Sequence, residues 1–335
     1  MKLSFNQIKD ITLGAVRITQ EKDGFHFYRF TAEQEEIYKA RSDKFYKKTF
    51  STSGIQLSFK TDSSSLFIKT VVFPCGSRQY FAFDIFVNGV KIDTVNNFSG
   101  VVLPDDYTEL TFPMGEFEKE IPLGIGEKEV CVYFPWSVTA VIRELALDEN
   151  ADIQPIRPSK KMLCFGDSIT QGYDALYPSN QYASQFAKLL GAEAYNKAIG
   201  GEIFCPELAS ARDDFEPDYI TVAYGTNDWD LCTEEAFCNN CKGFFENLGT
   251  NYPNSRIYAI TPIWRKDYEE CISFGGFDRV AEIIENIAES YDNVIVIPGF
   301  HLVGHDERLF GDLCLHPNDA GFAQYFRNLA KAIEV

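Results

Sequence analysis

An apolar run at residues 162–165 ends in Gly166-Asp167-Ser168-Ile169-Thr170, and this junction constrains the fold more than any other feature of the chain. The run predicts a short buried strand, and the glycine after it permits a sharp turn. Ligands of α/β proteins bind at the carboxyl ends of the strands, so the junction predicts a serine hydroxyl at that edge of a sheet. Gly-Asp-Ser is also ordinary turn chemistry, so the rest of the chain must decide between a turn and a catalytic site.

Beyond residue 160, strand-like and helix-like patterns alternate. The expected strands cover residues 162–165, 194–199, 219–224, 257–260 and 294–297. Between and after them lie apolar stripes of helical spacing, for the first of which we expect Ser179 to be the N-cap. Short apolar strands separated by helices predict a parallel sheet that is covered on both faces.

The N-terminal half, up to about residue 147, alternates with period two instead. The alternating residues are Ile55, Leu57, Phe59, Phe81, Phe83, Ile85, Val130, Val132 and Phe134. With the hairpin signal Asn88-Gly89, this pattern predicts antiparallel strands in an all-β sandwich of jelly-roll type. At 335 residues the chain is longer than most single domains. We therefore predict a β-sandwich over residues 1–150, a Pro-containing linker over 151–160 and an α/β domain over 161–335.

A serine hydroxyl becomes an effective nucleophile when a neighbouring base takes its proton. Of the four histidines, His316 stands on an expected loop, in Leu-His-Pro-Asn-Asp just before a helical pattern. Two further segments follow strand-like runs, and they contain Gly201 and Asn227. A backbone N–H at a glycine and a side-chain amide are the groups that stabilise the oxyanion of acyl transfer.

These four blocks resemble those of the SGNH (GDSL-type) hydrolases, which are named for a serine, a glycine, an asparagine and a histidine. Ser168, Gly201, Asn227 and His316 match the four blocks in order, over roughly the last half of the chain. The resemblance implies a flavodoxin-like parallel sheet and a serine esterase or acylhydrolase that needs no metal and no cofactor. It also implies that Ser168 is the nucleophile and His316 the general base. The N–H groups of Ser168 and Gly201 and the Asn227 side chain would form the oxyanion hole.

One position departs from the family pattern. The acid of the triad usually stands three residues before the histidine, where this chain has Leu313, while Asp312 stands four before. Either the loop is bulged and Asp312 still accepts from the imidazole, or a backbone carbonyl orients His316 and the enzyme works as a Ser-His dyad. We favour Asp312, because an orienting carboxylate also stabilises the imidazolium.

The substrate is constrained by charge and by architecture. A net charge of −18 argues against nucleic acid, strongly anionic polymers and lipid surfaces as partners, and leaves neutral acylated molecules. A small β-sandwich before an SGNH domain resembles carbohydrate esterases that remove acetyl groups, so we expect a deacetylase of neutral saccharides. Trp264 could stack on a sugar or pack in a loop, Trp229 could line an acyl pocket, and Tyr173 and Asp174 could bind substrate hydroxyls or merely face solvent. The alternatives are a lipid or thioester acylhydrolase and a non-catalytic binding protein.

The cellular setting is predicted from what the sequence lacks. The first ten residues do not contain the apolar core of a signal peptide, and no run approaches the length of a membrane span, so we expect a cytoplasmic protein. Nine scattered cysteines fit reduced thiols. Cys238 and Cys241 have metal-ligand spacing, but Cys241 falls on an apolar helical stripe, so we expect packing rather than zinc binding. The sequence leaves open whether the protein forms a homo-oligomer.

Overall fold

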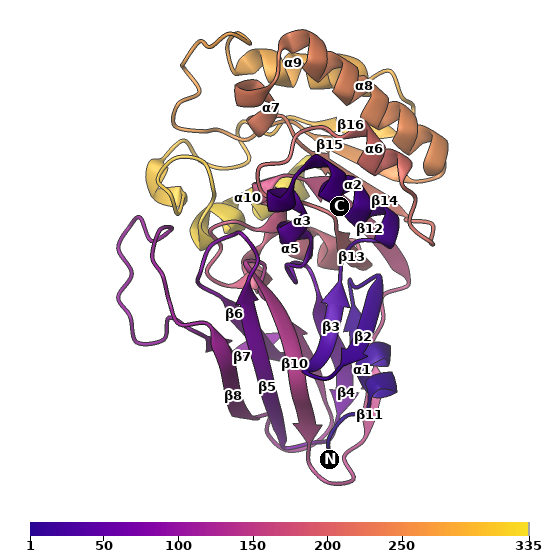
Figure 1. Ribbon diagram of the computed structural model, residues 1–335, viewed down its shortest axis with the longest axis vertical. Helices are drawn as coiled ribbons and strands as arrows, with labels where there is room; N and C mark the ends of the chain where they lie inside the picture. The colour runs from indigo at the N-terminus through magenta and orange to yellow at the C-terminus, as the bar shows by residue number, and fades with distance from the viewer. Residues whose placement is uncertain (334–335) are drawn as a thin grey trace.

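The computed structural model describes residues 1–333, which form a β-sandwich and an α/β layer stacked end to end (Figure 1). The first sheet of the sandwich is antiparallel and has the order β1 (Thr12–Leu13), β4 (Gln56–Thr61), β9 (Lys128–Tyr133), β6 (Ala82–Val87), β7 (Val90–Asn96), with β11 (Ile153–Pro155) paired to β4. The second is also antiparallel and has the order β2 (Arg17–Glu21), β3 (Gly24–Tyr28), β10 (Val138–Leu147), β5 (Ser65–Pro74), β8 (Gly115–Pro122).

The sandwich forms as the period-two pattern predicts. Inward residues such as Leu57, Phe83 and Val132 are fully buried in one apolar core between the sheets. The β6–β7 hairpin turns at Asn88 and Gly89, whose φ angles of 50° and 80° are both positive, as a type I′ turn requires.

The third sheet is parallel, with the order β13 (Ala192–Asn196), β12 (Lys160–Gly166), β14 (Tyr219–Ala223), β15 (Arg256–Ile260), β16 (Val294–Ile297). The helices that follow its strands are α4 (Ser168–Gln171), η1 (Pro178–Asn180), α5 (Tyr182–Leu189), α6 (Pro206–Ser210), α7 (Thr226–Leu231), α8 (Glu234–Asn251), α9 (Asp278–Ala288), η2 (Glu307–Leu309) and α10 (Asp319–Ala332). Successive residues of a strand face opposite sides: Leu163 packs in the core with α6, α8 and α9, while Met162 packs in the core with α5 and α10. The prediction of a doubly covered parallel sheet behind an all-β sandwich is confirmed.

The N-terminal half also contains helices that the alternation did not predict: α1 (Phe5–Ile11), α2 (Ala32–Arg41) and α3 (Asp43–Thr49). Phe30 and Tyr38 belong to the same buried core as Leu163 of β12, so the α2–α3 segment packs on the α/β layer (Figure 1). Strand β11 lies within the segment expected to be a linker. The division into domains at residues 150 and 161 stays a prediction.

The prediction that Ser179 is the N-cap of helix α5 is wrong. Helix α5 has Gln181 at its N-cap without a side-chain hydrogen bond. Ser179 instead donates its hydroxyl (2.6 Å) and its backbone N–H (3.0 Å) to the buried Asp84 carboxylate, which comes from β6 of the sandwich.

No helix within residues 1–333 has the length and apolar character that a membrane crossing requires.

Candidate active site

Ser168 is delivered to the carboxyl edge of the parallel sheet by the turn between β12 and α4. Gly166 is required there, because a β-carbon at this position would come within 2.2 Å of the Thr170 hydroxyl. Asp167 caps the short helix by accepting a hydrogen bond from the Ile169 N–H at 2.9 Å. Burial raises the pKa of the Asp167 carboxyl to about 6. Ser168 itself is only 3% exposed, so its position is fixed by packing.

His316 joins the serine to a carboxylate. Its Nε2 atom lies 2.8 Å from Ser168 Oγ, and its Nδ1 atom lies 2.6 Å from Asp312 Oδ2. A nucleophile, a base and an orienting acid in hydrogen-bond contact are the arrangement that activates a serine.

The loop before His316 accommodates the extra residue by a left-handed kink. Leu313 has φ of 55°, an uncommon conformation for a branched side chain. The kink lets Asp312 Oδ1 accept from the backbone N–H groups of Cys314, Leu315 and His316, at 3.0, 2.8 and 3.1 Å. The contact expected for the bulged-loop alternative is therefore present, while the catalytic role of Asp312 stays a prediction.

The electrostatics of this pair favour an ionised acid beside a basic imidazole. Burial alone would raise the pKa of the Asp312 carboxyl, but the hydrogen bond and charge of His316, with the loop N–H groups, hold it well below its usual range. Burial alone would lower the pKa of His316, but the hydrogen bond to Asp312 and the negative charges of Asp174 and Asp312 raise it.

Asp174, expected from the sequence to bind a substrate hydroxyl or to face solvent, is instead a buried second carboxylate at the histidine. Its Oδ2 atom lies 3.7 Å from His316 Nδ1, and the side chain is fully buried. Two sandwich residues hold it: Arg78 Nε and the Tyr80 hydroxyl both donate to Oδ1 at 2.9 Å. The sequence offers one signal that Asp174 lies at the site, its position shortly after the Gly166–Thr170 junction. Its contacts could not be predicted, because its partners lie about a hundred residues earlier in the chain.

The expected oxyanion donors lie on two neighbouring loops. Gly201 has φ of 86°, and the Asn227 side-chain amide donates to the Glu202 carbonyl at 2.9 Å, which leaves its second N–H for a ligand. No backbone carbonyl within residues 1–333 accepts a hydrogen bond from the N–H groups of Ser168 and Gly201. Buried Asp228 ties the two loops by accepting from the Gly225 and Phe204 N–H groups, both at 3.0 Å.

The expected substrate-binding aromatics are packed. Tyr173 is 7% exposed and lies against the His316 ring, with 5.3 Å between centroids. Trp264 is also 7% exposed and stacks on His305, while Trp229 is 1% exposed in the core. Such burial is typical of packing residues, and the roles of all three in substrate binding stay predictions.

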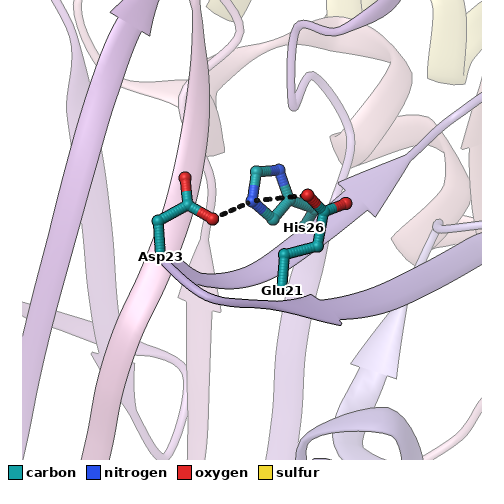
Figure 2. Close-up of side chains that lie close together, drawn as sticks. All are labelled: Glu21, Asp23 and His26. Carbon is teal, nitrogen blue, oxygen red and sulfur yellow. Dashed lines mark hydrogen bonds and ion pairs between the residues drawn. The ribbon is translucent and has the colours of Figure 1, made fainter.

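A separate histidine–carboxylate cluster lies on the β2–β3 hairpin (Figure 2). His26 Nε2 is 2.8 Å from Asp23 Oδ1 and 4.0 Å from Glu21 Oε2, so both carboxylates approach the same ring nitrogen. The hydrogen bond from His26 lowers the pKa of the Asp23 carboxyl. Within residues 1–333, this cluster and the group Asp174, Asp312 and His316 each bring three possible metal ligands within 4.8 Å. The expectation of no metal stays a prediction.

Residues 164–324 match the GDSL-like Lipase/Acylhydrolase family, which confirms the resemblance of the four sequence blocks. Among curated proteins, none matches this chain. Three solved structures show the same fold. A salicylyl-acyltransferase, SsfX3, from a tetracycline biosynthetic pathway is 20% identical with a TM-score of 0.80, over 96% of this chain and 93% of that one. A putative GDSL-like lipase from Bacteroides ovatus is 20% identical with a TM-score of 0.75, over 98% and 96%. An acetyl xylan esterase, Est2A, from the rumen bacterium Butyrivibrio proteoclasticus is 16% identical with a TM-score of 0.63, over 100% and 97%.

Proposed function

We propose that this ester-cleaving hydrolase, whose residues 164–324 match the GDSL-like lipase/acylhydrolase family, is a serine esterase that removes acetyl groups from neutral saccharides. The observation that carries the proposal is the chain of contacts from Ser168 Oγ through His316 to Asp312, at 2.8 and 2.6 Å. In this proposal the three residues act as nucleophile, general base and orienting acid.

Both halves of the reaction, transfer of the acetyl group to Ser168 and its release by water, follow from these contacts. His316 Nε2 takes the proton of Ser168 Oγ as the oxygen attacks the ester carbonyl, and Asp312 stabilises the imidazolium that forms. Negative charge moves to the carbonyl oxygen, which the N–H groups of Ser168 and Gly201 and the Asn227 amide would bind. His316 then returns the proton to the departing sugar oxygen, and an acetyl group remains on Ser168. Water, deprotonated by the same imidazole, releases acetate and restores the serine.

The preference for neutral acetylated saccharides rests on charge and on architecture. With a net charge of −18, the protein would repel acidic polymers and anionic lipid surfaces. The sandwich-plus-sheet fold is shared with an acetyl xylan esterase, a likeness that supports the proposal by analogy of fold. The alternative is a lipid or thioester acylhydrolase.

Hydrolysis of p-nitrophenyl acetate by the wild type, Ser168→Ala and the exposed-site control Ser99→Ala tests the proposal. We expect activity in the wild type and the control, none above background in Ser168→Ala, and one acetyl group on Ser168 by mass spectrometry after rapid quenching. Activity retained in Ser168→Ala would contradict the nucleophile. Acetylated xylo-oligosaccharides should be better substrates than octanoyl esters or acyl thioesters, and the reverse order would favour the alternative.

A further inference from the structure

The turn that carries Gly201 is of type II. The Glu202 N–H donates to the Ile199 carbonyl at 3.1 Å, and Gly201, the third residue of the turn, has φ of 86°. Types I and II differ mainly in the orientation of the central peptide, here the one that joins Gly200 to Gly201. In a type I turn the Gly201 N–H points to one face of the turn, and in a type II turn it points to the opposite face.

The two glycines give this peptide little resistance to rotation. Gly200 cannot be replaced, because a β-carbon there would lie 2.5 Å from the Tyr173 ring and hydroxyl. Without β-carbons on either side, the chain offers no steric barrier that favours one turn type. Another contact must therefore select the orientation.

Lys48 of α3 makes that contact. Its Nζ atom donates to the Gly200 carbonyl at 2.5 Å, and the residue is only 5% exposed. The backbone N–H of the same glycine, Gly200, donates to Gln171 Oε1 at 2.8 Å. Because the C=O and N–H of a trans peptide point in opposite directions, a carbonyl held at Lys48 turns the Gly201 N–H away from Lys48.

We propose that Lys48 is a positioning residue of the oxyanion hole, which holds the Gly200–Gly201 peptide in the orientation that presents the Gly201 N–H to the acyl oxygen. The inference rests on the proposed function. It also gives the α2–α3 segment a part in the reaction, although that segment lies outside the matched family region.

The charges around Lys48 leave its ammonium available for this contact. Burial lowers the pKa of Lys48 to about 8, Lys44 and Arg78 act in the same direction, and Cys75 and Glu202 oppose them. The amine is therefore mostly protonated at neutral pH, and a charged donor strengthens the hydrogen bond. Glu202 does not compete for it, because Arg41 binds both oxygens of the Glu202 carboxylate, at 2.7 and 2.9 Å.

The test compares Lys48→Met, Lys48→Arg and Lys47→Met, an exposed neighbour on the same helix, by kcat and KM for p-nitrophenyl acetate. The second measurement is inhibition by a trifluoromethyl ketone, whose adduct with Ser168 places an oxyanion in the hole. We expect Lys48→Met to lose about 10- to 100-fold in kcat with KM changed by less than about twofold, and to bind the ketone more weakly by a similar factor. Lys48→Arg should recover much of the loss, and Lys47→Met should behave as the wild type.

A Lys48→Met protein with wild-type kcat, or one whose kcat falls while ketone binding is unchanged, would overturn the inference. If Lys48→Met does not fold, Lys48→Gln, which keeps a polar group on a shorter chain, takes its place with the same expected losses. The proposed function fails separately: a wild type that hydrolyses no ester, or a Ser168→Ala protein that does, refutes it and this inference with it.

Discussion

Asp312 approaches the Nδ1 atom of His316 to 2.6 Å although the two residues are four apart in the chain. The left-handed conformation of Leu313, with φ of 55°, folds the extra residue into the loop. The same nitrogen lies 3.7 Å from Asp174. The imidazole is thus flanked by two carboxylates, one in hydrogen-bond contact and one at longer range.

If Asp312 orients His316, Asp312→Asn should lower kcat by about 10²- to 10⁴-fold, because the amide can favour the wrong imidazole tautomer. The loss should exceed that of Asp174→Asn, which removes only the longer-range charge and for which we expect about tenfold or less. Steady-state kinetics with a thermal melt of each variant makes the comparison. A near wild-type rate with an unchanged melt in Asp312→Asn would exclude the triad and favour the dyad.

The raised pKa of His316 predicts the acid limb of the pH profile. The base must be neutral to accept the serine proton, so kcat/KM should rise with pH through a midpoint above 6.5, the ordinary value for histidine. In Asp312→Asn the hydrogen bond and charge that raise this pKa are gone, so the midpoint should move to lower pH. Measurement of kcat/KM from pH 5 to 9 checks both expectations, and a midpoint that does not move between the two proteins would contradict the coupling.

Asn227→Ala should lower kcat by about 10²- to 10³-fold with a smaller change in KM, as expected for a donor aimed at charge that develops in the transition state. The structure adds a complication, because the same amide supports the Glu202 carbonyl at 2.9 Å. Asn247→Ala is a matched control, since Asn247 Nδ2 donates to a backbone carbonyl at 2.8 Å from helix α8. We expect the two variants to lose similar amounts of melting temperature, and only Asn227→Ala to lose rate. That outcome would show that the lost rate reflects catalysis and not a loss of stability. A change confined to KM would assign Asn227 to substrate binding.

The parallel sheet and the nucleophile turn could be predicted because their signals are local. The apolar run before Gly166, for instance, is the buried end of β12, and the alternation around Leu57 and Phe59 is that of β4. Helices α2 and α3 gave no such signal, because they are mostly charged and bury few side chains, among them Gln34, Tyr38 and Lys48. The surface that these helices pack on the core mixes polar Gln34 and Lys48 with aromatic Tyr38, and a search for apolar stripes overlooks such a mixture.

A capping box could have revealed α2. Thr31 accepts from the Gln34 N–H at 3.2 Å, and Gln34 Oε1 accepts from the Thr31 N–H at 3.1 Å, which is the pattern that Thr-x-x-Gln predicts at a helix start. The contacts of Lys48 with Gly200 and of Arg78 with Asp174 join residues 152 and 96 apart. Contacts of that kind leave no periodicity in one sequence.

The two glycines of the oxyanion loop should respond differently to alanine. In Gly200→Ala the new methyl group meets the Tyr173 ring at 2.5 Å, so we expect a large loss of melting temperature. In Gly201→Ala the methyl group has room, with its nearest neighbour at 3.6 Å, but φ of 86° costs about 1–2 kcal/mol for any residue with a β-carbon. Relief of that strain would rotate the peptide, so Gly201→Ala should lose rate more than stability. Equal melts in the two variants would contradict this account.

The α/β layer should depend on the N-terminal half for its stability. Arg29 is fully buried and donates to the carbonyls of Asn196 and Ala198, at 2.7 and 3.0 Å, just before the oxyanion loop. Lys197, also fully buried, donates to the Arg29 carbonyl at 2.8 Å. Removal of such partners leaves buried polar groups unpaired, at about 1–3 kcal/mol each.

We therefore expect Arg29→Met to lose at least about 3 kcal/mol of unfolding free energy in urea, against less than about 1 kcal/mol for Arg17→Met. Arg17 is the matched control because it forms an exposed ion pair with Glu35 at 3.0 Å. For the same reason, a fragment of residues 161–335 should not unfold cooperatively, since Lys197 would keep only Asp213, at 2.5 Å, of its partners. A cooperative melt and esterase activity in that fragment would show that the α/β layer folds independently and that Arg29 is dispensable to it.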